Sequence, residues 1–106
     1  MRKIDVIIKR PDEEYGHKTC ISDRLENLQR TVGGYIEFVN WEINGKEILI
    51  ICNEEGKLLG LEPNIAMGTM SAYDEICGTI IVCGRDGEDI TDIPISFQEW
   101  KEELGE

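Results

Sequence analysis

The sequence predicts a single α+β domain over residues 1–106, with about five mostly antiparallel strands, a central helix at about 22–32 and a C-terminal helix at about 96–104. Two observations predict this class. The apolar residues before Gly33-Gly34 recur with a helical period, and those after it alternate with a strand period. Elsewhere, short apolar runs are separated by turn-forming residues, which is typical of a sheet. We therefore expect a helix that packs directly on a sheet.

The glycine pair Gly33-Gly34 marks the boundary between helix and strand. Glycine ends a helix at little steric cost because it adopts the left-handed conformation readily. Ser22 or Asp23 is expected to cap the start of this helix by accepting a backbone N–H. The expected apolar stripe of the helix consists of Ile21, Leu25, Leu28 and Val32. One face of the strand that follows would carry Tyr35, Glu37, Val39 and Trp41.

The predicted strands lie between turn-forming residues. They cover residues 2–8, 35–41, 47–52, 57–61 and 78–83. Asn44-Gly45 predicts a tight type I′ hairpin, and Asn53–Gly56 predicts a second hairpin turn. Residues 47–52 are almost continuously apolar, which indicates a central strand covered on both faces.

Four other segments complete the expected fold. Residues 12–20 are expected to form a loop, 64–73 a short helical or irregular piece, and 88–94 an acidic loop. Ser96-Phe97-Gln98-Glu99 is a capping box that predicts the start of the last helix. Trp100 would bury its ring in the core and pack against Ile95.

The charge of the chain is strongly negative and unevenly distributed. The formal net charge is −11, and residues 31–106 carry sixteen acids against four Lys and Arg. Such a field repels nucleic-acid phosphates and acidic membranes, so we expect neither as a direct partner. No apolar run reaches the ~20 residues of a membrane span, and the charged start does not resemble a secretory signal. A cytoplasmic protein with four reduced cysteines is the expectation.

An acidic surface formed by the C-terminal part of the chain is the leading candidate site. It would bind a basic surface of a host protein, with the protein itself a monomer or a small homo-oligomer. The candidate partner-binding residues are Asp86, Glu88, Asp89, Asp92, Glu99, Glu102 and Glu103. No acid–base pair or nucleophile motif is evident, so we expect no catalytic residue and no enzymatic activity.

Two alternatives remain open at this point. The first is a small-ligand or nucleotide-binding protein, with a pocket formed by Gly33, Gly34, Tyr35 and Trp41. The second is a zinc protein. His17 and Cys20 have a ligand-like spacing, but a structural zinc site usually needs four ligands. Core or surface thiols are the simpler interpretation of the four cysteines, and no cofactor is expected.

Three blocks of sequence, in order, resemble a known family. They are Leu25-x-x-Leu28-Gln29-x-x-Val32-Gly33-Gly34-Tyr35-Ile36-Glu37, then residues 53–64 (NEEGKLLGLEPN), then Ile76-x-Gly78-Thr79-Ile80-Ile81-Val82. Together they are similar to domain of unknown function 3846, over roughly residues 25–84. That family occurs in phages, plasmids and other mobile elements of mostly Gram-positive bacteria. The resemblance implies a mobile-element context, in which small acidic proteins are often stoichiometric inhibitors of the anti-CRISPR or anti-restriction type.

Overall fold

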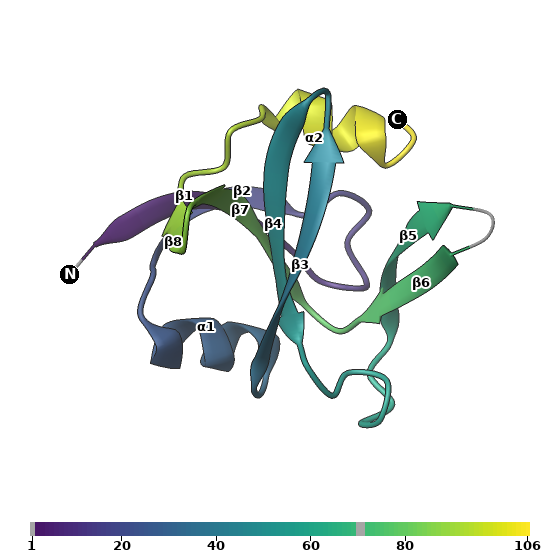
Figure 1. Cartoon of the computed structure of the whole chain (residues 1–106). Coiled ribbons are helices and arrows are strands. Elements are labelled where there is room, and N and C mark those ends of the chain that lie inside the picture. Colours follow the sequence, from purple (N-terminus) through teal and green to yellow (C-terminus); the bar gives the residue numbers. More distant parts are fainter. Residues whose placement is uncertain (1, 70–71) are drawn as a thin grey trace.

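The computed structural model describes residues 2–69 and 72–106. Ten elements follow one another along the chain (Figure 1). They are β1 (Lys3–Lys9), β2 (His17–Ser22), α1 (Leu25–Val32), β3 (Ile36–Ile43), β4 (Lys46–Asn53), β5 (Pro63–Thr69), β6 (Ala72–Cys77), β7 (Ile80–Asp86), β8 (Asp89–Thr91) and α2 (Phe97–Glu103). The α+β class and the two helices are as the sequence predicts. Neither helix is long and apolar enough to span a membrane, in the part of the chain that the structure describes.

The main sheet is antiparallel and has the strand order β2-β1-β7-β4-β3. β8 pairs with the far end of β7, and β5 and β6 form a separate hairpin. The two helices lie on opposite sides of the sheet (Figure 1). Each face of the sheet therefore has its own helix to cover it.

Two apolar cores result, one on each face. On the face that α2 covers, Trp100 packs with Ile48 and Ile50. On the face that α1 covers, Leu28 packs with Leu49 and Ile51. Successive side chains of a strand point to opposite faces, so β4 contributes alternately to both cores. The expected interior position of this strand is confirmed.

The predicted tight turn at Asn44-Gly45, the helix end at Gly33 and the capping box at Ser96 are confirmed. Asn44 and Gly45 have φ values of 53° and 76°, as a type I′ hairpin requires. Gly33 ends α1 in the left-handed region with φ 84°. At the start of α2, Ser96 and Glu99 form both bonds of the capping box.

Residues 12–20 and the start of α1 differ from the prediction. The last part of the expected loop, residues 17–20, belongs to a strand, because β2 pairs with β1 and places Ile21 opposite Ile4. The helix therefore begins only at Leu25, and this residue of the expected apolar stripe is 54% exposed instead of buried. Neither Ser22 nor Asp23 caps it; Arg24 occupies the N-cap position without a side-chain bond. Pairing with β1 takes precedence over the local helical period.

Three more segments also differ. Residues 57–61 form turns, not a strand, and the expected second hairpin at Asn53–Gly56 is absent. Residues 64–73 contribute to the β5–β6 hairpin, not to a helical piece; of these, 70 and 71 lie outside the described residues. The expected loop at 88–94 contains β8, whose pairing with β7 supplies backbone partners that an acidic sequence does not reveal.

Candidate docking surface

The structure divides the predicted acidic residues into those that support the fold and those that face solvent. Asp92 accepts a hydrogen bond from the Asp5 N–H at 2.8 Å, which ties the chain after β8 to β1. Glu99 accepts from Asn44 Nδ2 at 3.1 Å and lies 3.6 Å from Lys46 Nζ. The bond from Asn44 is the largest cause of the lowered pKa of Glu99. Both carboxylates are therefore poor candidates for binding a partner.

The remaining acids of α2 form a second group. Glu102 accepts from Gln98 Nε2 at 3.2 Å, and the same nitrogen donates to Glu106 at 2.9 Å. Lys101 lies 3.1 Å from Glu106. Glu103, the last residue of α2, is exposed. Lys101 thus balances the charge of Glu106, which follows α2, whereas Glu102 accepts only from a neutral amide.

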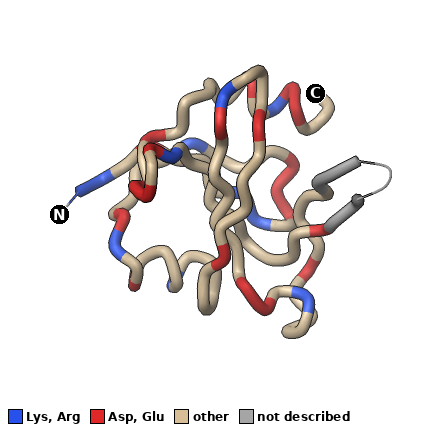
Figure 2. The backbone as a smooth tube through the Cα atoms, viewed as in Figure 1, with Lys and Arg blue, Asp and Glu red and all other residues tan. Residues whose placement is uncertain are grey.

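The β7–β8 hairpin carries the acidic residues that the fold uses least. Asp86 and Asp89 face each other across the hairpin, and Glu88 lies in the turn between them. None of the three forms an ion pair with any residue that the structure describes. In Figure 2 the hairpin, whose backbone is coloured red at the acidic positions, lies toward the N-terminus and away from α2.

Arg85 fixes this hairpin to the neighbouring sheet. Its Nε donates to the Gly87 carbonyl at 2.6 Å, inside the turn. Its Nη1 donates to Asn40 Oδ1 at 3.0 Å, so the guanidinium spans from β7 across β4 to β3. A planar group with fixed donors is well suited to hold two acceptors at once. The acidic turn is consequently a positioned element of the surface.

A cleft of about 210 Å³ lies between the hairpin and the sheet. Its lining residues are Phe38, Leu49, Arg85, Glu88, Asp89 and Ile90. The Phe38 ring is 51% exposed on the floor. Glu42, two pairs further along β3, lies on the same face and pairs directly with Glu47 of β4. Such a like-charge pair is unfavourable in isolation, and it adds negative potential beside the cleft.

The sequence does not identify Phe38 or Arg85 as site residues. The strand alternation places Phe38 on one face, and it gives no indication that α1 leaves this part of the face uncovered. The pairing of β8 with β7, which brings the acidic turn beside Phe38, falls in the segment 88–94, for which the sequence predicts a loop. Glu88 and Asp89 are the predicted residues that the structure brings to this cleft.

The four residues of the alternative ligand pocket do not converge. Gly34 lies so close to the Asn53 side chain that a Cβ added at Gly34 would be 3.0 Å from Asn53 Nδ2. Tyr35 is 67% exposed, whereas Trp41 packs edge-on against Trp100 with ring centroids 6.1 Å apart. Six residues of strand place these two aromatic side chains about 20 Å apart.

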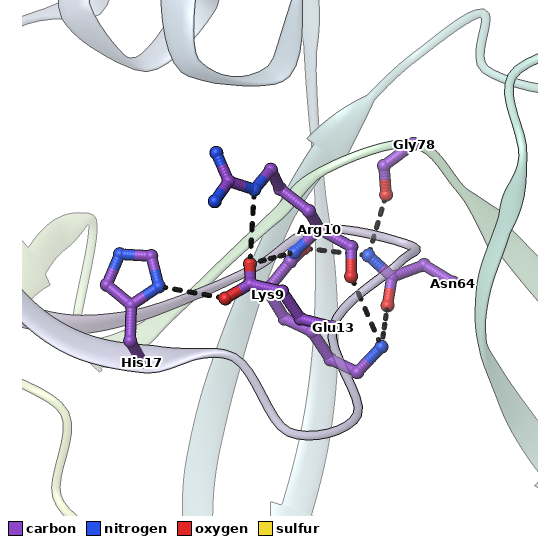
Figure 3. Close-up of polar contacts among 6 residues, drawn as sticks. All are labelled: Lys9, Arg10, Glu13, His17, Asn64 and Gly78. Atoms are coloured by element: carbon purple, nitrogen blue, oxygen red, sulfur yellow. Dashed lines mark hydrogen bonds and ion pairs between the residues drawn. The ribbon is translucent and has the colours of Figure 1, made fainter.

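Trp41 instead lines a different cleft, of about 430 Å³, together with Lys9, Asn64 and Glu103. Lys9 is only 4% exposed, and its Nζ donates to Asn64 Oδ1 at 2.7 Å and to the Arg10 carbonyl at 3.5 Å (Figure 3). Burial is the largest cause of its lowered pKa, and the charges of nearby acids act in the opposite direction.

Asn64 connects three parts of the chain around this lysine. Its Nδ2 donates to the carbonyls of Lys9 and Gly78, each at 2.8 Å (Figure 3). Beside it, Glu13 accepts from the Arg10 N–H at 2.9 Å and lies 3.2 Å from His17 Nδ1. The bond from Arg10 is the largest cause of the lowered pKa of Glu13. These contacts hold the β1–β2 connection and the start of β5 together.

The cysteines and the histidine are dispersed. His17 and Cys20 are three residues apart on β2, so their side chains point to opposite faces of that strand. Cys77 and Cys83 belong to different strands, β6 and β7. Burial raises the pKa of the Cys83 thiol to about 12, which disfavours the thiolate form that binds metals. The described residues contain no group of three His, Cys, Asp or Glu side chains arranged to hold a metal ion.

The fold and this surface define a small α+β protein with an acidic cleft beside an exposed aromatic ring. The chain belongs to the family described as Domain of unknown function (DUF3846), whose model matches residues 1–105. The match includes the N-terminal segment and the acidic tail, which lie outside the three blocks at 25–84. Searches of the curated proteins and of the solved structures found no match.

Proposed function

We propose that this is a non-enzymatic acidic binding protein of a phage or mobile element, which acts as a stoichiometric inhibitor of a host defence protein. The observation that carries the proposal is the acidic β7–β8 hairpin, held by Arg85 beside the exposed Phe38. A basic surface on the partner would place Lys or Arg side chains against Glu88 and Asp89. The aliphatic stems of these Lys or Arg side chains would cover the Phe38 ring, and the ring face would also attract their positive charge.

A nuclease of the anti-phage defence is the class of target that best fits this surface. Its nucleic-acid groove is already basic, so an acidic protein competes there with phosphates. The excess of acids on residues 31–106 would also accelerate the encounter at low ionic strength. The proposal places binding at the hairpin, not at α2, because Glu88 and Asp89 adjoin the exposed Phe38, whereas Glu99 of α2 already stabilises the fold.

The experiment compares two charge-reversed variants of equal net charge. Glu88→Lys with Asp89→Lys changes the hairpin, and Glu102→Lys with Glu103→Lys changes α2. Immobilised protein captures partners from a host lysate at low and at high salt, and the purified partner is then titrated for 1:1 binding and for inhibition of its activity. We expect the hairpin variant to lose binding by at least about tenfold per charge-assisted contact, and the α2 variant to retain it.

Two outcomes would contradict the proposal. One is equal binding by the wild type and the hairpin variant, with the same salt dependence. The other is a partner that binds without any loss of its own activity. Far-UV circular dichroism of each variant establishes that the fold is intact, since all four substitutions lie on exposed positions.

A second candidate function is small-ligand binding in the cleft beside Trp41. The observation that favours it is the buried ammonium of Lys9, which has no carboxylate partner within ion-pair distance among the described residues. A thermal-shift panel of nucleotides and small carboxylates tests this candidate, with Lys9→Met as the matched control. A shift that persists in Lys9→Met would place the ligand elsewhere.

A further inference from the structure

The outer edge of β3 is open. β3 is the last strand of the order β2-β1-β7-β4-β3, and among the described strands it pairs only with β4. Hydrogen bonds in an antiparallel pair alternate, so every second residue directs its N–H and C=O groups away from the neighbour. Ile43 and Lys46 close the two-residue turn, and the Tyr35 carbonyl accepts from the Glu54 N–H. The residues whose backbone N–H and C=O groups point away from β4 are therefore Ile36, Phe38, Asn40 and Glu42, called the outward residues below.

This edge lacks most of the usual features that prevent strand pairing, although β3 carries two exposed glutamates, Glu37 and Glu42. The β3–β4 register continues from Ile36 to Ile43 without a bulge, and β3 contains neither proline nor lysine. The opposite edge of the sheet, β2, is shorter and carries Lys18. Phe38 adds an exposed apolar side chain next to the outward backbone groups. A long, regular and partly apolar edge favours the addition of another strand.

We propose that β3 pairs with β3 of a second copy, antiparallel and with Val39 opposite Val39 of the other chain. In this register Phe38 lies opposite Asn40 and Ile36 opposite Glu42, so all outward residues form hydrogen-bonded pairs. The centre of the pairing lies near the middle of the eight-residue strand, so nearly the whole edge is used. The interface is isologous and closes as a two-fold dimer.

The two glutamates of β3 disfavour some of the alternative registers. Pairing centred on residue 37 would place Glu37 against itself, and pairing centred on residue 42 would place Glu42 against itself. Like charges directly opposite each other are destabilising. With Val39 at the centre, Glu37 faces Trp41 and Glu42 faces Ile36, so no acid is opposite another acid. The charges thus permit the pairing centred on Val39, and it is this register that pairs all four outward residues, Ile36, Phe38, Asn40 and Glu42.

The dimer would place the two Phe38 clefts on the same side of one continuous sheet. Opposite residues of paired strands point to the same face, and Phe38 and Asn40 are opposite each other across the proposed interface. A basic partner with two suitable patches would then be bound twice, which strengthens binding without new contacts. Dimerisation itself does not depend on the proposed function, and its test needs no partner.

Disulfide trapping tests the register. Val39→Cys is introduced with Cys20→Ser, because Cys20 is the exposed cysteine of the native chain. Residues opposite each other in a non-hydrogen-bonded pair have Cβ atoms about 4.5–5.5 Å apart, close to disulfide geometry. The matched control is Glu37→Cys in the same background, where the two thiols would be about 14 Å apart along the strands. Mild oxidation should give a covalent dimer of the first protein and not of the second.

Sedimentation equilibrium tests the backbone interaction. The wild type should form dimers that dissociate on dilution, and Asn40→Pro should weaken dimerisation at least about tenfold, because it removes an outward N–H twice per dimer. Asn40→Ala is the control: it loses the bond to Arg85 and keeps the N–H, so it should dimerise as the wild type does. A wild type that stays monomeric, a folded Asn40→Pro that dimerises normally, or equal trapping of both cysteine variants would overturn the proposal.

Discussion

Removal of the Asn64 side chain should destabilise the fold more than any other loss of a single amide. Asn64 accepts from Lys9 Nζ at 2.7 Å and donates to the carbonyls of Lys9 and Gly78 at 2.8 Å each. Lys9 as a whole is 4% exposed, and in Asn64→Ala its ammonium would retain, among the described residues, only the Arg10 carbonyl at 3.5 Å. An unsatisfied buried group costs about 1–3 kcal/mol, and more if it is charged.

The magnitude follows from these contacts. Two neutral hydrogen bonds contribute about 1 kcal/mol each, and the charge-assisted bond about 2 kcal/mol, a sum of about 4 kcal/mol. Water that enters from the adjacent cleft replaces part of this loss, so we expect Asn64→Ala to lower the free energy of unfolding by about 3 kcal/mol. In urea, with a slope of about 1.5 kcal/mol per molar, the unfolding midpoint should fall by about 2 M.

Equilibrium urea denaturation followed by tryptophan fluorescence measures this shift. Gln98→Ala is the control, since it removes an exposed amide that also makes two hydrogen bonds and should change the free energy by less than about 0.5 kcal/mol. Lys9→Met removes the ammonium and keeps the apolar stem. If Asn64→Ala costs less than about 1 kcal/mol, or costs the same in a Lys9→Met background, the buried ammonium is not what Asn64 stabilises.

The pH dependence of stability gives a second test of Lys9. Burial lowers the pKa of Lys9 in the folded state below its ordinary value of 10.5. At pH values between the lowered pKa of the folded state and the ordinary pKa of the unfolded state, the unfolded chain binds more protons than the folded chain. The contribution of Lys9 to stability therefore rises with pH in this window. Lys9→Met should lack this contribution. The free energies of unfolding of wild type and Lys9→Met are measured from pH 7 to 10.5. The wild type should gain stability relative to the variant as the pH rises; a constant difference would refute the assignment.

Three further predictions concern the core and the caps. Trp100→Phe should lower the free energy of unfolding by about 2 kcal/mol, because it removes the bond from Trp100 Nε1 to the Tyr15 carbonyl at 2.8 Å and creates a cavity at a fully buried site. Thermal unfolding measures this loss, and an unchanged stability would refute the prediction. Ser96→Ala should cost about 1 kcal/mol through loss of the α2 cap, whereas Ser96→Asp should retain most of the stability. Of the four thiols, only Cys20 should react rapidly with a thiol reagent in the native state, because the other three are buried. Above pH 9 the contribution of Cys83 to the free energy of unfolding should decrease, because burial raises its folded pKa from the ordinary 9.0 to about 12 and the unfolded chain loses the proton first.

Much of the fold is encoded in local sequence patterns. The Asn44-Gly45 turn, the glycine that ends α1 and the Ser96 capping box all act within a few residues, so the sequence determines them without reference to the rest of the chain. The continuous apolar run of β4 requires cover on both faces and thereby places this strand in the interior. The α+β class and the membership of residues 25–84 in the family also follow from the sequence.

The tertiary structure decided what the sequence patterns leave open. Residues 12–20 and 64–73 have weak local preferences, and partner strands determine that residues 17–20 join β2 and that much of the β5–β6 hairpin forms from the second segment. In the same way, β8 pairs with β7 and brings Glu88 and Asp89 beside Phe38, while Glu99 and Asp92 turn to internal partners. A charge pattern along the chain specifies how many carboxylates there are. Which of them remain available depends on non-local hydrogen bonds, and only the folded chain fixes those.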